Sequence, residues 1–330
     1  MLNKISYIIS EGNNVYQNQA LEEYLLSVVE KDECILYLWQ NDKTVVIGRN
    51  QNSRAECDIN ALNKDGGHLA RRLSGGGAVY HDMGNINFTF IMPRCEYNLD
   101  KQLDVILCAV NLLGIHAVKS GRNDITVDNR KFSGNAFYKT ANSAYHHGTI
   151  MFSSELSALS KYLTVAPDKL KAKGVKSVRS RVANLDEFRD SLSRTDVISA
   201  LLSAFGNIYG GTAQRLANSR LNTQSLESLR SKFASEAWIF GSEPPFNYTS
   251  YCRYPWGSAD LRLDIKDNII KTAVLYTDAM DENLAEKISG IFADMPLKAQ
   301  EINMAIAAQS AEYGNILKDI TTMFEELIIK

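Results

Sequence analysis

The residues with the clearest chemical potential lie in segment 71–82, which reads RRLSGGGAVYHD. Glycine lets backbone N–H groups approach a ligand closely, because no Cβ stands in the way. The two arginines before the glycines carry guanidinium groups, which suit phosphate or carboxylate. The glycines match neither a Walker loop, since Ala78 follows Gly77, nor a dinucleotide fingerprint, since a predicted strand follows them. A site for a small anion and a tight turn between strands 68–72 and 77–80 both stay open.

Two more groups of possible ligand-binding residues follow further along the chain. Asp124 opens a predicted strand after residues 121–123, where its carboxylate could bind Mg²⁺ or simply cap a turn. Lys131 begins the next predicted strand, and the small residues Ser133, Gly134 and Ala136 leave space beside it. This lysine could reach a ligand oxygen, although a lone lysine is usually a solvated surface charge.

A histidine pair and a basic segment complete the candidates. His146 could contact a bound acid, or it could belong to a hydrogen-bond network within a strand. Segment 169–181 carries six lysines and arginines and no acidic residue. It could be a lid that closes over a reactive intermediate, or a solvated loop.

Composition describes an ordinary globular protein. The chain has 330 residues, of which 45% are hydrophobic and 22% charged, with a formal net charge of −2. This balance favours neither nucleic acid nor a membrane surface as a partner, and no apolar run approaches the roughly 20 residues that span a bilayer. The five cysteines are scattered and form no Cys-x-x-Cys pair, which argues against disulfides and zinc and predicts a reducing cytoplasm. The N-terminus shows no pattern of a signal peptide.

Hydrophobic periodicity predicts a mixed α/β domain followed by a smaller one. Asn18 is the expected N-cap of the first helix, and segment 40–43 is expected to join two strands as a hairpin. Helices are predicted over 18–30, 54–63, 99–113, 154–162, 195–205 and 225–233. Strands are predicted over 35–39, 44–47, 68–72, 77–80, 86–92, 115–119, 124–127, 131–138 and 144–152.

The regular patterns are interrupted at residues 241–245, a Gly-Ser-Glu-Pro-Pro segment that is typical of a linker or domain edge. Beyond it the pattern predicts a hairpin of 259–266 with 269–276, then helices near 282–292, 297–308 and 312–328. We therefore expect a domain over 1–245 that carries the chemistry, and an accessory docking or closing domain over 246–330.

Taken together, these segments resemble the lipoate–protein ligase A family. Segments 71–85, 121–124, 131–136, 146–149 and 173–182 occur in the order and spacing of that family, segments 18–23 and 44–52 fit as well, and the similarity covers the whole chain. A small departure is Asn135, where the family often has another small polar residue. The resemblance implies an α/β (α+β) fold, with a mixed-sheet catalytic domain like that of biotin and lipoate ligases and a smaller α+β C-terminal domain.

The resemblance also implies a two-step, ATP-dependent reaction. Lipoate and Mg·ATP give lipoyl-AMP and pyrophosphate, and a lysine of an E2 lipoyl domain or of glycine-cleavage H protein then takes the lipoyl group and releases AMP. Lys131 would be the catalytic residue, Asp124 would contact Mg²⁺, and segment 169–181 would close on the adenylate. The implied adenylate-binding residues are Arg72, Gly77, Ala78, Val79, Tyr80, Asp124 and Lys131. The implied lipoate-binding residues are Gly75, Gly76, Lys131, Ser133, Gly134, Ala136 and His146.

Two alternatives stay open. A lipoyl or octanoyl transferase of the same superfamily would need no ATP step and would use a cysteine nucleophile. A non-catalytic module would bind lipoate or lipoyl domains without needing a phosphate site. For the ligase we expect ATP, Mg²⁺ and lipoate as substrates, no tightly bound metal, a monomer in the cytoplasm, and neither nucleic acid nor membrane as a partner.

Overall fold

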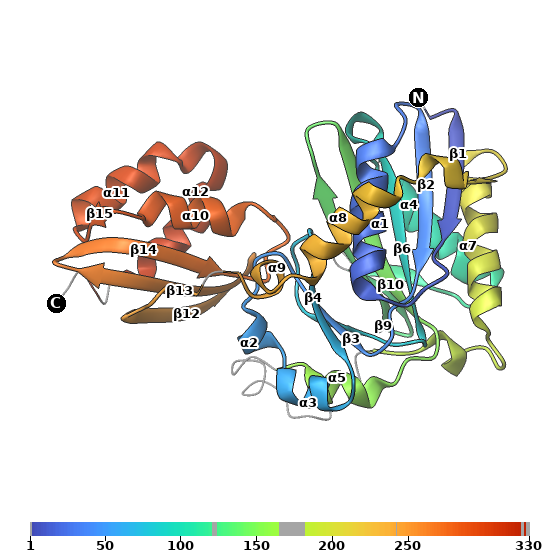
Figure 1. The fold of residues 1–330 in the computed structure, drawn as a ribbon, viewed down its shortest axis with the longest axis horizontal. Helices are drawn as coiled ribbons and strands as arrows, with labels where there is room; N and C mark the ends of the chain where they lie inside the picture. Colours follow the sequence, from blue (N-terminus) through green and yellow to red (C-terminus); the bar gives the residue numbers. More distant parts are fainter. Residues whose placement is uncertain (1, 121–123, 165–181, 242, 325–326, 328–330) are drawn as a thin grey trace. The chain divides into compact units, whose positions relative to one another are not determined.

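The computed structural model describes residues 2–120, 124–164, 182–241, 243–324 and 327, and it has the mixed α/β class predicted from the sequence (Figure 1). The chain divides into two compact units. The first comprises Met1–Val46, Arg54–Arg72 and Val79–Ile239, and the second comprises Ile47–Ser53, Leu73–Ala78 and Phe240–Lys330. Two short internal segments thus group with the C-terminal part, and the domain boundary at residue 245 stays a prediction.

The first unit centres on an eight-stranded mixed sheet with the order β11-β1-β2-β6-β10-β9-β8-β7. Strand β1 runs parallel to both of its neighbours, and the other pairs are antiparallel. The bounds are β1 (Lys4–Ile9), β2 (Glu33–Trp39), β6 (Asn85–Pro93), β7 (Val118–Ser120), β8 (Asp124–Val127), β9 (Arg130–Lys139), β10 (Ser143–Met151) and β11 (Gln214–Arg215).

Helices cover both faces of this sheet, so its central strands are buried on both sides. Helices α4 (Leu99–Leu112) and α7 (Arg194–Tyr209) pack together, and their apolar residues share one core with Leu36, Leu38, Phe88 and Phe90. Helix α1 (Val15–Val28) contacts β2, β6 and β10 and packs against α8 (Thr223–Ala234). Alternate residues of each strand therefore point to α1 or to α4 and α7.

Helix α1 begins one turn earlier than the sequence predicts. Asn14, not Asn18, is the N-cap, because its side chain accepts hydrogen bonds from the N–H groups of Tyr16 and Gln17. Asn18 lies inside the helix and is buried, and its amide donates to the carbonyl of Gln40. The polar residue that looks like a cap from the sequence is thus part of a buried network.

A second, three-stranded sheet has the order β4-β3-β5, formed by β4 (His68–Arg71), β3 (Thr44–Ile47) and β5 (Val79–His81). The predicted hairpin across 40–43 is therefore wrong. Strand β2 has its backbone paired with β1 and β6 on both edges, so β3 joins the other sheet. Strands β4 and β5 flank β3, so the glycine segment is no tight turn between paired strands.

Short helices complete this unit: α2 (Ser53–Glu56), α3 (Ile59–Lys64), α5 (Leu156–Tyr162) and α9 (Glu236–Phe240). Single 3₁₀ turns lie at Arg94–Glu96, Leu185–Glu187 and Asn218–Arg220.

The second unit has a sheet of order β12-β13-β14-β15 with helices α10, α11 and α12. The predicted hairpin is confirmed: β13 and β14 are joined by Asp267 and Asn268, whose φ values of 53° and 56° are typical of a two-residue hairpin turn. Leu261, Phe292 and Phe324 are fully buried in its core. The bounds are β12 (Tyr248–Tyr254), β13 (Gly257–Lys266), β14 (Ile269–Tyr276), α10 (Leu284–Phe292), β15 (Met295–Pro296), α11 (Ala299–Ala308) and α12 (Ser310–Thr322).

Candidate active site

Lys131 and Asp124, both predicted site residues, form an ion pair. The Nζ of Lys131 lies 2.7 Å from Oδ1 of Asp124, and the side chains are 37% and 44% exposed. Antiparallel pairing of β8 and β9 brings them together, since it places Asp124 opposite Gly134 and Thr126 opposite Lys131. A half-exposed pair adds little to stability. Its importance is that it holds a cation and an anion side by side where a charged ligand can reach them.

Gly134 leaves the room that this lysine occupies. A Cβ at Gly134 would lie 3.1 Å from both Cε and Nζ of Lys131, closer than ordinary van der Waals contact. The N–H of Gly134 donates to Oγ1 of Thr149 on β10, at 3.2 Å. Lys131, Gly134 and Thr149 therefore lie on the same face of the sheet.

This face continues along β10 to a buried polar network that was not predicted from the sequence. Every second residue of a strand points to the same side, so Tyr145 and His147 share the face of Thr149. The Nδ1 of His147 lies 2.9 Å from Oε1 of Glu22, which also accepts a hydrogen bond of 2.7 Å from Thr89. Thr89 in turn accepts from the indole N–H of Trp39, at 3.0 Å. Glu22 belongs to the early segment that fits the family pattern, which was the available signal.

His146 faces the opposite side. Its ring lies against Phe88 and Phe90, and its Nε2 lies 2.9 Å from Oδ1 of Asn135. Burial lowers the pKa of His146 to about 3, so this imidazole is neutral at physiological pH. Of the two adjacent histidines, His147 and not the predicted His146 shares the face of Lys131.

The predicted lipoate-binding residues of β9 are likewise divided between the two faces. Ala136 lies opposite His147 and so shares its face, as does Gly134. Ser133 is fully buried and alternates to the other face, together with Asn135. A register shift at Ile125 and Thr126 places Lys131 on the face of Gly134. Sequence alternation alone could not reveal such a bulge.

Arg72 is a buried cation close to this network. Its Nη1 donates to the carbonyl of Val46, at 3.1 Å. Burial lowers the pKa of Arg72 to about 10, while Tyr145 and Glu22 act in the opposite direction, so the guanidinium stays charged at neutral pH. Burial also lowers the pKa of His81 to about 3, with Arg72 and His147 contributing. Residues of α1, β5 and β10 and the residue that directly follows β4 therefore influence one another electrostatically.

Arg71 has a structural role, although the sequence suggested that both arginines could hold an anion. Its guanidinium donates to the carbonyls of Trp238 and Ile239, and the indole of Trp238 donates to the carbonyl of Arg71 at 2.8 Å. These bonds satisfy carbonyl groups in the last turn of α9. Arg72, in contrast, couples electrostatically to Glu22 and Tyr145 of the buried network.

The glycines of segment 73–78 differ in their surroundings. A Cβ on Gly75 would lie 2.4 Å from the carbonyl oxygen of Ala279, and the N–H of Gly76, whose φ is 90°, donates to the same oxygen at 3.0 Å. Gly77 is exposed, and a Cβ there would meet no atom within 4 Å. Gly75 and Gly76 thus allow close packing within the second unit, whereas Gly77 has open space beside it. Their roles in ligand binding stay predictions.

Comparison with known proteins decides the family. Residues 14–206 match the lipoyl protein ligase A/B catalytic domain, and residues 243–327 match the bacterial lipoate protein ligase C-terminus. The lipoate–protein ligase A of Psychrobacter cryohalolentis is 37% identical, over 98% of both chains. The chain belongs to the lipoate–protein ligase A family. It is therefore an enzyme, as the resemblance of its motifs implied.

Solved structures of other ligases share the fold. LipL1 of P. falciparum, determined in complex with lipoate, has a TM-score of 0.83 at 29% identity and covers 96% of this chain and 98% of its own. A lipoate–protein ligase A bound with ATP has a TM-score of 0.63 at 25% identity, covering 73% of this chain and 99% of its own. A bipartite archaeal ligase from Thermoplasma acidophilum, described with its E2 lipoyl domain, has a TM-score of 0.65 at 26% identity, covering 75% and 100%.

Two predicted features of this ligase lie partly or wholly outside the described residues: the motif 121–124, of which only Asp124 is described, and the basic segment 169–181. The chain re-enters the described structure beside the catalytic candidate, where the N–H of Ala183 donates to the carbonyl of Lys131 at 3.0 Å. Among the described residues, no three His, Cys, Asp or Glu side chains gather to hold a metal. The single carboxylate of Asp124 fits a Mg²⁺ ion that arrives with substrate phosphates.

Two of the five cysteines, Cys34 and Cys57, are poorly suited to act as a transferase nucleophile. Cys34 and Cys57 are buried, and burial raises the pKa of both thiols, that of Cys57 to about 12. Thiols with such high pKa values carry almost no thiolate at neutral pH. Cys108 packs against the core, Cys252 lies on β12, and Cys95 lies in a 3₁₀ turn.

Across the described residues, no helix is both long and apolar enough to cross a bilayer.

Proposed function

We propose that this ligase joins lipoate to ATP as lipoyl-AMP and then transfers the lipoyl group to a lysine of a lipoyl-accepting protein. One observation carries the proposal. A cation–anion pair, Lys131 with Asp124, lies on the same sheet face as the buried network of Glu22, Thr89 and His147. The ammonium of Lys131 supplies positive charge for a phosphate and a carboxylate, and Asp124 supplies a carboxylate for Mg²⁺.

In the first step a carboxylate oxygen of lipoate attacks the α-phosphorus of ATP, and pyrophosphate leaves. No protein nucleophile is needed, because the acid is itself the nucleophile. Two anions must be brought together, and the ammonium of Lys131 stabilises the negative charge that they share. Arg72 and the exposed backbone at Gly77 are further candidates for holding the nucleotide. Asp124, which pairs with Lys131, is the candidate that would contact Mg²⁺ when Mg·ATP binds.

In the second step the amine of an acceptor lysine attacks the carbonyl carbon of lipoyl-AMP, an amide forms, and AMP leaves. Lys131 again stabilises negative charge, first on the tetrahedral carbonyl oxygen and then on the departing phosphate. The amine must be neutral to attack. Its nitrogen becomes positively charged when it bonds to the carbonyl carbon, and it then releases one proton to solvent as the amide forms. The basic segment 169–181 is the candidate that would limit hydrolysis of the adenylate before the acceptor arrives.

Lipoyl domains of E2 subunits are the acceptors that we propose first, because the archaeal ligase with a similar fold was described together with its E2 lipoyl domain. Glycine-cleavage H protein is the second acceptor, proposed on the family resemblance alone. We further propose that the enzyme acts as a cytoplasmic monomer.

Lipoate-dependent exchange of labelled pyrophosphate into ATP tests the first step. The parent enzyme should catalyse exchange, and Lys131→Ala should lose it by roughly a hundredfold or more, the effect of removing a preorganised charge-stabilising group. A matched control is Lys139→Ala, which alters an exposed lysine at the far end of the same strand. Near-normal exchange in Lys131→Ala would contradict the role given to Lys131. Transfer from supplied lipoyl-AMP without any exchange in the parent would make the protein a transferase only.

A further inference from the structure

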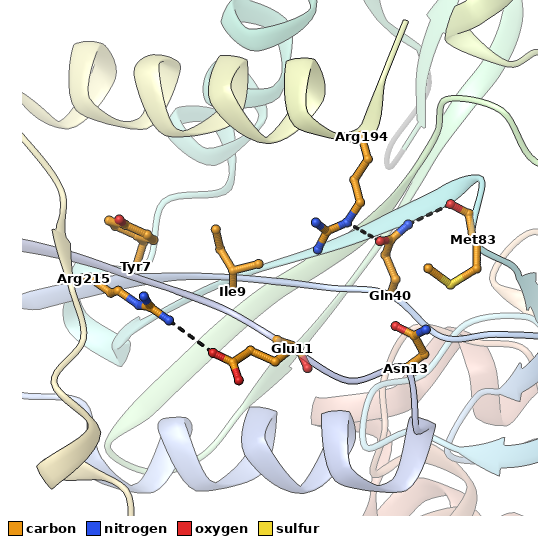
Figure 2. A pocket seen from close by; sticks show the side chains of 9 residues that line it. Tyr7, Ile9, Glu11, Asn13, Gln40, Met83, Arg194 and Arg215 are labelled. Carbon is orange, nitrogen blue, oxygen red and sulfur yellow. Dashed lines mark hydrogen bonds and ion pairs between the residues drawn. The ribbon is translucent and has the colours of Figure 1, made fainter.

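A pocket lies in the first unit, on the other face of the large sheet from Lys131. It has a volume of about 580 Å³, and Tyr7 and Ile9 of β1 contribute its apolar wall (Figure 2). Both residues pack against the core shared by α4 and α7. The sheet therefore separates this pocket from the face that carries Lys131 and His147. Its volume falls in the range of pockets that bind small molecules.

One end of the pocket holds a guanidinium that is oriented by buried groups. The Nε of Arg194 donates to the side-chain oxygen of Gln40. Gln40 is only 3% exposed, and its amide nitrogen donates to the carbonyls of Met83 and Asn85 at 2.8 and 3.2 Å. The orientation of the Gln40 amide is thereby determined, since a flipped amide would place oxygen against two carbonyls. Within the described chain, the terminal nitrogens of Arg194 have no protein acceptor.

A second guanidinium, that of Arg215 on β11, lines the same pocket. Its Nη2 lies 3.4 Å from Oε1 of Glu11, and the two side chains are 63% and 90% exposed. A pair this long and this exposed is weak, because water screens it and both side chains lose freedom on pairing. A ligand carboxylate can therefore replace Glu11 at little cost. Figure 2 shows Ile9 between the two arginines in this view.

We propose that this pocket binds a short aliphatic dicarboxylate. One carboxylate would accept from the terminal nitrogens of Arg194, the second would replace Glu11 at Arg215, and the methylene groups between them would contact Ile9 and Tyr7. Arginine suits this role because its planar fork donates two parallel hydrogen bonds to a carboxylate. The site is separate from the proposed lipoate and ATP sites, so binding does not depend on the ligation reaction.

Glutarate is the probe, and the methyl group of Met83 at the rim of the pocket is the local reporter. Full-length protein labelled with ¹³C at the methionine methyls is titrated with glutarate at constant ionic strength. The Met83 resonance should shift saturably, whereas that of Met304, 60% exposed in the second unit, should not move. Glutaramide, the neutral analogue, should leave Met83 unchanged. Lys131→Ala should bind glutarate like the parent, which separates this test from that of the proposed function.

Substitutions decide whether the arginines carry the binding. Arg194→Gln and Arg215→Gln should each weaken glutarate binding by roughly tenfold or more, the effect of losing charge-assisted hydrogen bonds. Arg230→Gln, which changes an exposed arginine on α8, should bind like the parent. Arg194→Gln should keep its ligase activity without glutarate, because Arg194 lies outside the catalytic face. Undiminished binding in both pocket variants, or no shift of Met83 in the parent, would overturn the proposal. A shift with a capped diglutamate peptide but not with glutarate would also overturn it, and would assign the pocket to acidic side chains of a partner protein.

Discussion

Replacing Gly134 by alanine should slow adenylation without harming the fold. The added Cβ would lie 3.1 Å from Cε and Nζ of Lys131, whereas ordinary contacts begin near 3.4 Å. The end of the lysine side chain must therefore move by a few tenths of an ångström, which displaces the ammonium that we propose to stabilise the reacting anions. Weakening a charge-assisted hydrogen bond from Lys131 to the reacting anions would raise the activation free energy by up to about 1.5–3 kcal/mol. This corresponds to a loss of roughly tenfold to a hundredfold in rate.

The fold should tolerate this change, because only a flexible side chain has to give way. Gly134 does not adopt a positive φ in the structure, and alanine also restricts the unfolded chain, so the midpoint of thermal unfolding should stay the same or rise slightly. The assay is pyrophosphate exchange, together with thermal unfolding followed by circular dichroism.

Two other glycines provide matched controls for Gly134→Ala. Gly290→Ala in α10 should leave exchange unchanged and stabilise the fold slightly, because a Cβ there meets no atom within 4 Å and alanine favours a helix over glycine. Gly148→Ala should destabilise the protein, because its Cβ would lie 2.6 Å from the backbone oxygen of Gly134. Exchange at the parental rate in a folded Gly134→Ala protein would refute the argument that this glycine positions Lys131.

Three further predictions concern the buried network, acid stability and the cysteines. Glu22→Ala should lower the free energy of unfolding by about 1–3 kcal/mol for each partner left unsatisfied, and it should raise the KM for lipoate. Glu23→Ala, which breaks a half-exposed pair with Lys232, should lower the free energy of unfolding by less than about 1 kcal/mol. Equal effects of the two substitutions in urea unfolding would contradict this assignment. Burial alone would raise the pKa of Glu33, but hydrogen bonds from Arg220 and Ser6 hold this pKa at about 2. Ionised Glu33 therefore contributes roughly 3 kcal/mol to the free energy of unfolding at pH values above its unfolded pKa. This contribution is lost as the pH falls from about 4.5 to about 2. Glu33→Gln should flatten the pH dependence of unfolding over that interval, and Glu30→Gln, at an exposed position, should leave it almost unchanged. A variant with all five cysteines replaced by alanine should retain exchange and transfer if it folds, and complete loss of transfer in a folded variant would favour a cysteine-dependent transferase.

The main elements follow local patterns that the sequence displays. The apolar period of α4, the alternation along β14 and the Asp267-Asn268 turn were each sufficient to predict an element near its observed position. The hairpin of 35–39 with 44–47 failed, because strand pairing depends on which distant strands occupy the edges of β2. Strand β1 was not predicted, although it pairs with β2 in parallel and supplies the apolar wall of the pocket that Arg194 and Arg215 line.

The sequence by itself determined the family and the residue types at the site, because several motifs, among them segments 71–85, 121–124 and 131–136, occur together in the order and spacing of the family. Only the tertiary structure decided which side chains share a face. The shift between β8 and β9 turns Lys131 toward Gly134, and the alternation of β10 selects His147 over His146. The last turn of α9, distant in sequence, supplies the carbonyl groups to which the guanidinium of Arg71 donates. These outcomes depend on register and long-range pairing, which local sequence does not encode.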